Sequence, residues 1–188
     1  MPAYPGGIFG GTLTPSIPGT GAGGTATTPF SVLDATAQMP IGITFMWNGA
    51  LYRYVKFNKG TGTVNSAVGG PAWASACTPA ASSTAQPIFT VTADQTDSIF
   101  GQTPVGVFGA IIVAATYDTY FTCIQIGGLA QCYVPASLTE DAIIGSSTDG
   151  QFGRIAAGSN ITRTQVGVRT SGASSSNLSP VLLMNMDW

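Results

Sequence analysis

The chain contains no histidine and very little charge. Only 7% of its 188 residues are charged, and the formal net charge is −2. Without histidine, neither a Ser-His-Asp nor a Cys-His catalytic group can be built, and histidine-containing zinc sites are excluded as well. The six Lys and Arg residues lie singly along the chain, so there is no basic stripe to neutralise a run of phosphates. We therefore expect no direct nucleic-acid partner.

Cysteine is scarce, and a long hydrophobic run is missing. The three cysteines, Cys77, Cys123 and Cys132, lack the Cys-x-x-Cys spacing of structural zinc, so we predict no metal and no cofactor. The apolar run from Val105 to Ala115 is far shorter than the ~20 residues of a spanning helix, and the start of the chain lacks the features of a secretory signal. We expect synthesis in the cytoplasm, reduced thiols and no membrane partner.

Glycine and proline, by contrast, are concentrated at the N-terminus. Of residues 1–29, 13 are Gly or Pro and none is charged, a composition that supports neither a helix nor a central strand. We predict an extended arm whose isolated apolar side chains bind pockets on another surface, with a solvated tail as the alternative. These candidate interface residues are Tyr4, Ile8, Phe9, Leu13 and Ile17.

One short helical turn is predicted at the end of this arm, over Ser31–Gln38. Ser31 is a suitable N-cap for it, and Pro40 ends it. The predicted organisation is therefore an arm over residues 1–40, which includes the helical turn, followed by a β domain over residues 41–188.

The rest of the chain is typical of strands and turns. Asn48-Gly49 accepts the positive φ angles of a type I′ turn and predicts a hairpin of Ile43–Trp47 with Ala50–Phe57. Turn residues then recur every 8 to 15 residues, which indicates a compact antiparallel β-barrel or sandwich and an all-β fold class. Further strands are predicted over 87–93, 104–116, 120–126, 129–134, 142–144, 151–157, 165–170 and 181–186, with a loop over 67–86.

The stretch CIQIGGLAQCYV, residues 123–134, predicts a second hairpin around Gly127-Gly128. In that register Cys123 lies opposite Cys132, with Cα atoms ~4.5 Å apart, close to the near limit for a disulfide. A bridge there would be somewhat strained, and we favour a pair of reduced, buried cysteines side by side on one face.

The carboxylates show no catalytic pattern. Asp94, Asp97 and Asp118 lie in sequences where Asp caps its own turn, and we favour that role over the paired acids of a β-sandwich hydrolase. We predict no catalytic residue and no enzymatic activity.

Several segments resemble small decoration, or cement, proteins of tailed-bacteriophage heads. Each motif is short, and the likeness lies in their order along the chain, mostly over residues 100–188. The segments are Gly49–Lys56, Pro104–Val107, Tyr120–Gly128, Ile143–Gly150 and Val166–Val168. The resemblance implies an all-β domain on the exterior of a capsid, in a virion whose proteins are made in the host cytoplasm.

The expected function is therefore that of a virion structural protein that cements neighbouring capsomers. Its expected partners are the major capsid protein and itself, as a dimer or trimer. The alternative is a glycan-binding β-module of a fibre or surface protein, in which exposed aromatic rings stack on sugars. The candidate rings for that alternative are Trp47, Tyr52, Tyr54 and Trp73.

Overall fold

The computed structural model describes residues 33–75, 89–99, 104–134, 143–148, 150–154, 167–169 and 178–183. These residues form ten strands and a single 3-10 turn, η3 (Gln95–Asp97), and no helix among them is long and apolar enough to span a membrane. The strands are β1 (Thr44–Trp47), β2 (Ala50–Phe57), β3 (Pro71–Ala74), β4 (Thr90–Thr92), β5 (Pro104–Phe108), β6 (Phe121–Tyr133), β7 (Ile143–Thr148), β8 (Gln151–Arg154), β9 (Gly167–Arg169) and β10 (Leu178–Leu183).

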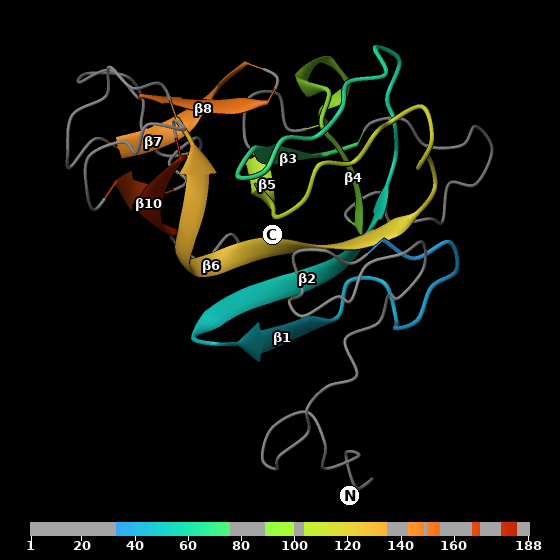
Figure 1. Cartoon of the computed structure of the whole chain (residues 1–188), viewed down its shortest axis with the longest axis horizontal. Helices are drawn as coiled ribbons and strands as arrows, with labels where there is room; N and C mark the ends of the chain where they lie inside the picture. Colours follow the sequence, from blue (N-terminus) through green and yellow to red (C-terminus); the bar gives the residue numbers. More distant parts are fainter. Residues whose placement is uncertain are drawn as a thin grey trace, which may run out of the picture.

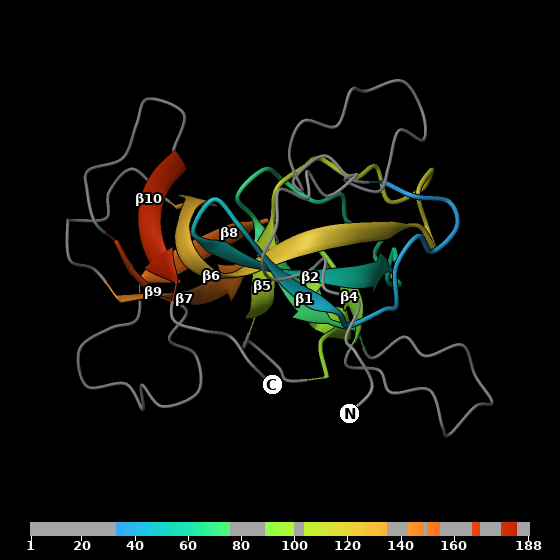
Figure 2. The same cartoon turned by 90° about the horizontal axis from the view of Figure 1, so that it is seen from below.

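Five of these strands close into a barrel. Their order is β2-β4-β3-β5-β6, and β6 pairs back onto β2. Strand β1 adds an edge beside β2, while β10, β9, β7 and β8 continue the sheet from the far half of β6 (Figures 1 and 2). The predicted all-β barrel is confirmed. It is not antiparallel throughout, because β2 and β4 run parallel.

The barrel is filled by residues that alternate along its strands. Val55 and Phe57 of β2 and Ile124 of β6 are fully buried in one core, where the Phe57 ring meets Phe108 edge-on at 6.0 Å. The opposite face of β2 carries Tyr52 and Tyr54, as the alternation of the sequence predicts. Tyr54 packs in a second, smaller cluster with Cys123, and the partly buried residues around this pair are Met39, Ile43, Phe45 and Phe121.

The first predicted hairpin is confirmed. Trp47 pairs with Ala50, and the two turn residues have φ angles of 47° for Asn48 and 77° for Gly49. These are the positive angles that a type I′ turn requires.

The second predicted hairpin is wrong, because residues 121–133 form one continuous strand. Cys123 pairs with Tyr54 of β2 and Cys132 with Ser179 of β10, so the two cysteines are not cross-strand partners. The Gly-Gly pair is instead a corner, visible in β6 in Figure 1. Gly128 has a φ of 82°, and a Cβ there would lie 2.8 Å from the Gly49 carbonyl oxygen. Only glycine fits this conformation and this close approach.

Three other predictions differ from the structure. The loop expected over 67–86 contains β3, whose four residues are all buried. The strand expected over 104–116 ends at Phe108. Residues 33–38, the described part of the expected helical turn, contain bends and a β-bridge between Asp34 and Phe121. Arm residues 1–32 lie outside the described part of the chain.

We expect Gly128→Ala to destabilise the fold more than Gly150→Ala. Both glycines have positive φ, but a Cβ at Gly150 meets nothing within 4 Å, whereas one at Gly128 meets the hairpin backbone. The left-handed conformation costs an alanine roughly 1–2 kcal/mol, and the clash adds to this only at Gly128. Urea unfolding of both variants measures the difference. Equal losses of stability would contradict the corner described here.

Candidate functional site

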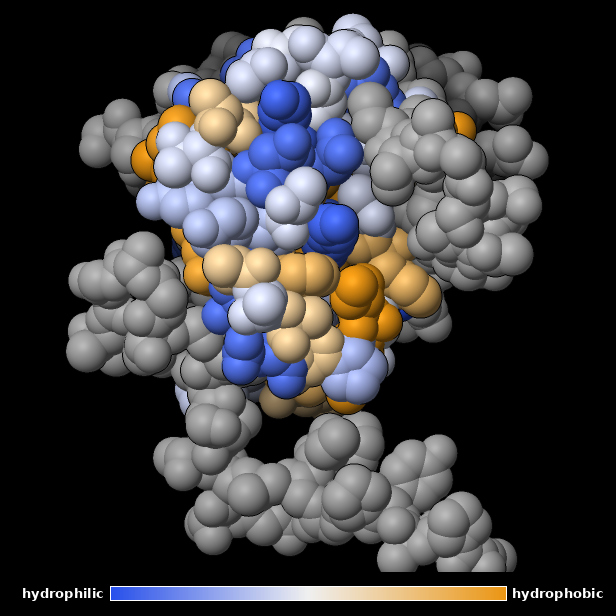
Figure 3. Space-filling model, turned by 90° about the vertical axis from the view of Figure 1, so that its right-hand side faces the viewer, coloured by the Kyte–Doolittle hydropathy of each residue, from blue (hydrophilic) through white to orange (hydrophobic). Residues whose placement is uncertain are grey.

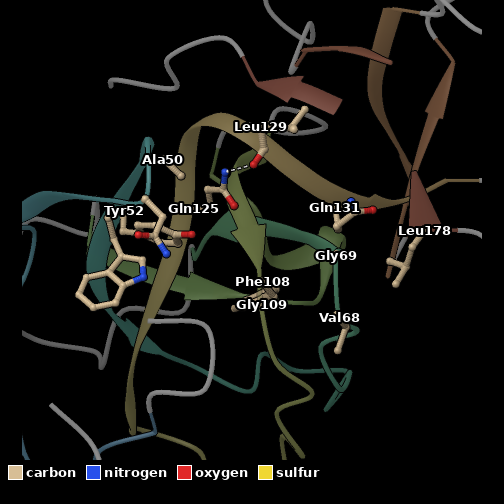
Figure 4. A pocket seen from close by; sticks show the side chains of 12 residues that line it. Ala50, Tyr52, Val68, Gly69, Phe108, Gly109, Gln125, Leu129, Gln131 and Leu178 are labelled. Atoms are coloured by element: carbon tan, nitrogen blue, oxygen red, sulfur yellow. Dashed lines mark hydrogen bonds between the residues drawn. The ribbon is translucent and has the colours of Figure 1, made fainter. Parts of the chain in front are cut away.

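A hollow of about 430 Å³ opens beside the corner of β6. It lies between the β1–β2 turn, the β6 corner, residues 68–69, the end of β5 and the start of β10 (Figure 4). Its volume is in the range of ligand pockets, and no charged residue lines it. The lining residues are Trp47, Asn48, Ala50, Tyr52, Val68, Gly69, Phe108, Gly109, Gln125, Leu129, Gln131 and Leu178.

A second hollow of about 290 Å³ continues the first. The two share Val68 and Leu178, and the second is lined otherwise by Ser66, Ala67, Ile111 and Tyr133. We call the two hollows together the groove. Its rim carries exposed apolar side chains, with exposed fractions of 59% for Leu129 and 62% for Ile111. The groove is therefore an uncharged surface with apolar edges.

Gly69 lines the larger hollow and is held there by two main-chain hydrogen bonds. Its N–H donates to the Phe108 carbonyl at 2.8 Å, and its own carbonyl accepts from the Tyr133 N–H at 2.8 Å. Its φ is 75°, and a Cβ would lie 2.6 Å from the Gln131 carbonyl oxygen. Glycine thus lets the chain cross tightly between β5 and β6, and places Val68 at the rim.

Gln125 is a buried polar side chain of the groove, with an exposed fraction of 1%. Its Nε2 donates to the carbonyls of Gly127 at 3.1 Å and Leu129 at 2.9 Å, which holds the corner in place. Its Oε1 is buried and has no hydrogen-bond partner among the described residues. Gln125 therefore stabilises the wall of the hollow.

The first described residues of the chain are joined to the barrel by a buried contact at Asp34. Main-chain hydrogen bonds join Asp34 and Phe121 in both directions, at 2.9 and 2.8 Å. The Tyr54 hydroxyl donates to Asp34 Oδ2 at 2.8 Å and accepts from the Gln38 N–H at 3.2 Å. Asp34 is therefore held to the start of β6.

Burial shifts the pKa of both side chains in this contact. Desolvation raises the pKa of Asp34, although the hydrogen bond from Tyr54 opposes the shift. The pKa of Tyr54 is raised as well, chiefly by desolvation. The Asp34 carboxylate therefore carries a cost in the folded state that its protonated form does not.

The other acidic residues that the structure describes connect loops by hydrogen bonds. Asp94 caps η3 by accepting from the Thr96 N–H at 3.0 Å, and its other oxygen accepts from the Gly62 N–H at 2.8 Å. Asp97 accepts from the Thr61 hydroxyl at 3.1 Å. The predicted turn role is confirmed for Asp94. Asp118 accepts instead from the Lys59 N–H at 3.1 Å, across two loops.

No metal centre is formed by the part of the chain that the structure describes, since no three Cys, Asp or Glu side chains gather there.

The aromatic residues considered for glycan stacking do not form a platform. Tyr54 and Trp73 are fully buried and Tyr52 is 2% exposed, which leaves only Trp47 half-buried at the groove. The side of the molecule in Figure 3 is polar in its upper part with an apolar band below it, so apolar surface is not confined to the groove.

Both described cysteines are free and buried. Desolvation, with a smaller effect of the nearby Asp34, raises the pKa of Cys123 to about 12. Burial also raises the pKa of Cys132. Both cysteines are therefore small, reduced hydrophobic residues, as one of the two sequence-based interpretations expected. The expected side-by-side placement is wrong. Cys77 lies outside the described residues.

The groove is not predictable from the sequence. It is assembled from five segments that are distant along the chain, and Val68 and Gln125 carry no motif. The one available signal is Gly69, a glycine beside Gly70 in the segment predicted as a loop.

Comparisons with known proteins add little to this description. No protein-family model matches the chain, and no curated protein matches it. Among solved structures, the N base of head fiber gp8.5 of bacteriophage phi29 is similar, at 10% identity and a TM-score of 0.45, over 71% of this chain and 93% of that one. This likeness is too low to assign a function to the chain.

We expect Asp34→Asn to be at least as stable as the natural chain at neutral pH. Asparagine keeps an acceptor for Tyr54 but removes the buried charge. Because the folded pKa of Asp34 is raised, its protonated form favours folding at low pH, and this contribution is lost as the pH rises through the folded pKa. Any advantage of the variant should therefore shrink as the pH falls. Urea unfolding of both proteins from neutral to acidic pH measures the difference in stability. An advantage of the variant that grows as the pH falls would contradict the prediction.

Tyr54→Phe should cost about 1–3 kcal/mol of unfolding free energy, because Asp34 and the Gln38 N–H both lose a buried partner. The same substitution in the Asp34→Asn background is the matched control. It should cost less there, since no buried charge is left unpaired.

The thiols of Cys123 and Cys132 should resist alkylation in the folded protein. With a pKa near 12, on the order of one Cys123 thiol in 10,000 is ionised at mildly alkaline pH. In a Cys77→Ser variant, we expect negligible labelling of the native protein and labelling of both thiols in urea. Rapid native labelling, or a mass gain of two hydrogens on reduction, would refute this.

Proposed function

We propose that this chain is a virion structural protein that binds the outer surface of a phage head and cements neighbouring capsomers. The observation that carries the proposal is the junction at Asp34. There, the chain that follows 33 residues without a charged side chain joins a closed barrel through hydrogen bonds to the start of β6. A hydrogen-bonded junction of this kind would keep an arm attached to the domain under load. A protein that links neighbouring capsomers needs such an attachment.

The composition of the chain supports the same role. Burying a charge against a partner carries a desolvation penalty, and this chain has few charges, none of them in the groove or the first 33 residues. Permanent contacts of about 800 Å² per partner are standard for one stable interface, and the symmetry of a shell repeats each of them. Many such contacts can resist internal pressure without any chemistry.

The segments that resemble head decoration proteins include two main parts of the barrel. Gly49–Lys56 falls on the first hairpin and β2, and Tyr120–Gly128 falls on β6 up to its corner. These strands pair with each other along six positions. The proposed partners are thus the major capsid protein and further copies of this chain, and we propose no enzymatic activity.

Purified chain added to phage shells that lack it should bind them and raise the temperature at which they break. A variant without residues 1–29 should keep the β-sheet circular dichroism of the full chain but give much less protection. The reason is that it retains Asp34 and the barrel and loses the apolar arm. Light scattering of heated shells measures the effect.

A matched control keeps the length of the arm and replaces Tyr4, Ile8, Phe9, Leu13 and Ile17 with serine. It should protect as poorly as the truncated variant. Equal protection by all three proteins would exclude a role for the arm, and failure of the full chain to bind any shell would remove the proposed function.

A further inference from the structure

We propose that the groove binds the N-terminal arm of a second copy of this chain. The proposal rests on one part of the proposed function, namely that the arm binds a neighbour, and adds which surface it binds. The contact would join copies of this protein to one another, separately from their contacts with the shell.

The groove and the arm are both uncharged and both carry apolar side chains. No lining residue of either hollow is charged, and no side chain before Asp34 is charged. The walls of the groove are largely aromatic and aliphatic, and the arm carries single apolar residues separated by glycine, proline and threonine. Aromatic side chains such as Tyr4 and Phe9 bury about 150–250 Å² each, so one ring that enters the larger hollow is a substantial anchor.

Two amide side chains add a polar element to this fit. Gln131 and Asn48 both line the larger hollow and provide amide groups for the main chain of an extended segment. Extended peptides are commonly bound in this way, by main-chain hydrogen bonds together with side-chain pockets.

The arm is long enough to reach a second copy. Asp34 is held at Phe121, and the larger hollow is reached eight residues later along β6, at Leu129, a path of at most ~26 Å at ~3.3 Å per residue. Seventeen residues separate Ile17 from Asp34, which span up to about 60 Å when extended. Residues 18–29 contain no large side chain and serve as a spacer. That the arm enters the groove of a second copy and not its own follows from the proposed function, in which the arm binds a neighbour.

Such an exchange of arms gives a closed assembly. If two copies exchange arms reciprocally the result is a dimer with two-fold symmetry, and if each arm passes to the next copy the result is a ring. In both cases every groove is filled, and the exposed apolar rim at Leu129 and Ile111 is covered.

The first test is the oligomeric state of the purified full chain, measured by sedimentation over a range of concentrations. We expect an oligomer whose association is at least about tenfold weaker in Leu129→Glu and Val68→Glu, since each places a charge in an apolar contact. Met46→Glu is the matched control, because Met46 is 66% exposed but does not line the groove. It should associate like the natural chain. A monomer at all concentrations, or equal weakening by Met46→Glu, would overturn the proposal.

The second test identifies the occupant. Phe9 is replaced with the photo-cross-linker p-benzoylphenylalanine in one preparation, which is mixed with natural chain grown on heavy nitrogen. We expect cross-linked peptides that join a light arm to heavy groove segments, such as those that contain Val68 or Leu129. Cross-links only within one chain would show that the arm fills its own groove, and cross-links to other surfaces would show that the groove binds something else. Both results contradict the proposal.

The two proposals fail in different ways. A monomeric chain that still binds and protects shells would leave the cement function intact and remove the arm exchange. An arm-exchanged oligomer that binds no shell would do the reverse.

Discussion

The structure depends on the corner in β6 at Gly127-Gly128. Before the corner, β6 pairs with β2 and β5 and closes the barrel, and after it the same strand pairs with β10 and begins the second half of the sheet. A single strand therefore belongs to both parts, and the positive φ of Gly128 allows the change of direction. The corner also forms one wall of the groove, and Gln125 braces it from within by two hydrogen bonds. The corner at Gly127-Gly128 thus shapes both the fold and the candidate site.

Low charge connects the arm, the groove and the proposed function. A chain with so few charged side chains contributes little electrostatic steering or salt-bridge specificity, so its recognition must come from shape, apolar contact and main-chain hydrogen bonds. The groove offers these features, and the arm has the composition to use them. The buried contact of Asp34 with Tyr54 then matters because it fixes Asp34 beside the start of β6, the strand that lines the groove further along.

Local sequence signals predicted the parts of the fold that are decided locally. Asn48-Gly49 fixes its hairpin because few other turns use that pair, and Asp94 caps its turn within two residues. The corner at Gly128 was not predictable, since Gly-Gly suits a tight turn as well as a bend, and the Gly49 backbone that decides between them is distant in sequence. Strand β3 was not predictable because both of its faces are buried, so its sequence shows no alternation of apolar and polar residues. The groove depends on tertiary contacts throughout.

The central proposal is that this chain cements neighbouring capsomers on a phage head, and its copy number tests that proposal most directly. Intact particles can be purified by density and digested, and the chain can be quantified by mass spectrometry against the major capsid protein with labelled standards. The account predicts that the chain copurifies at a number comparable with that of the shell protein, as repeated surface contacts require. Its absence from washed particles, or presence in only a few copies, would contradict the account.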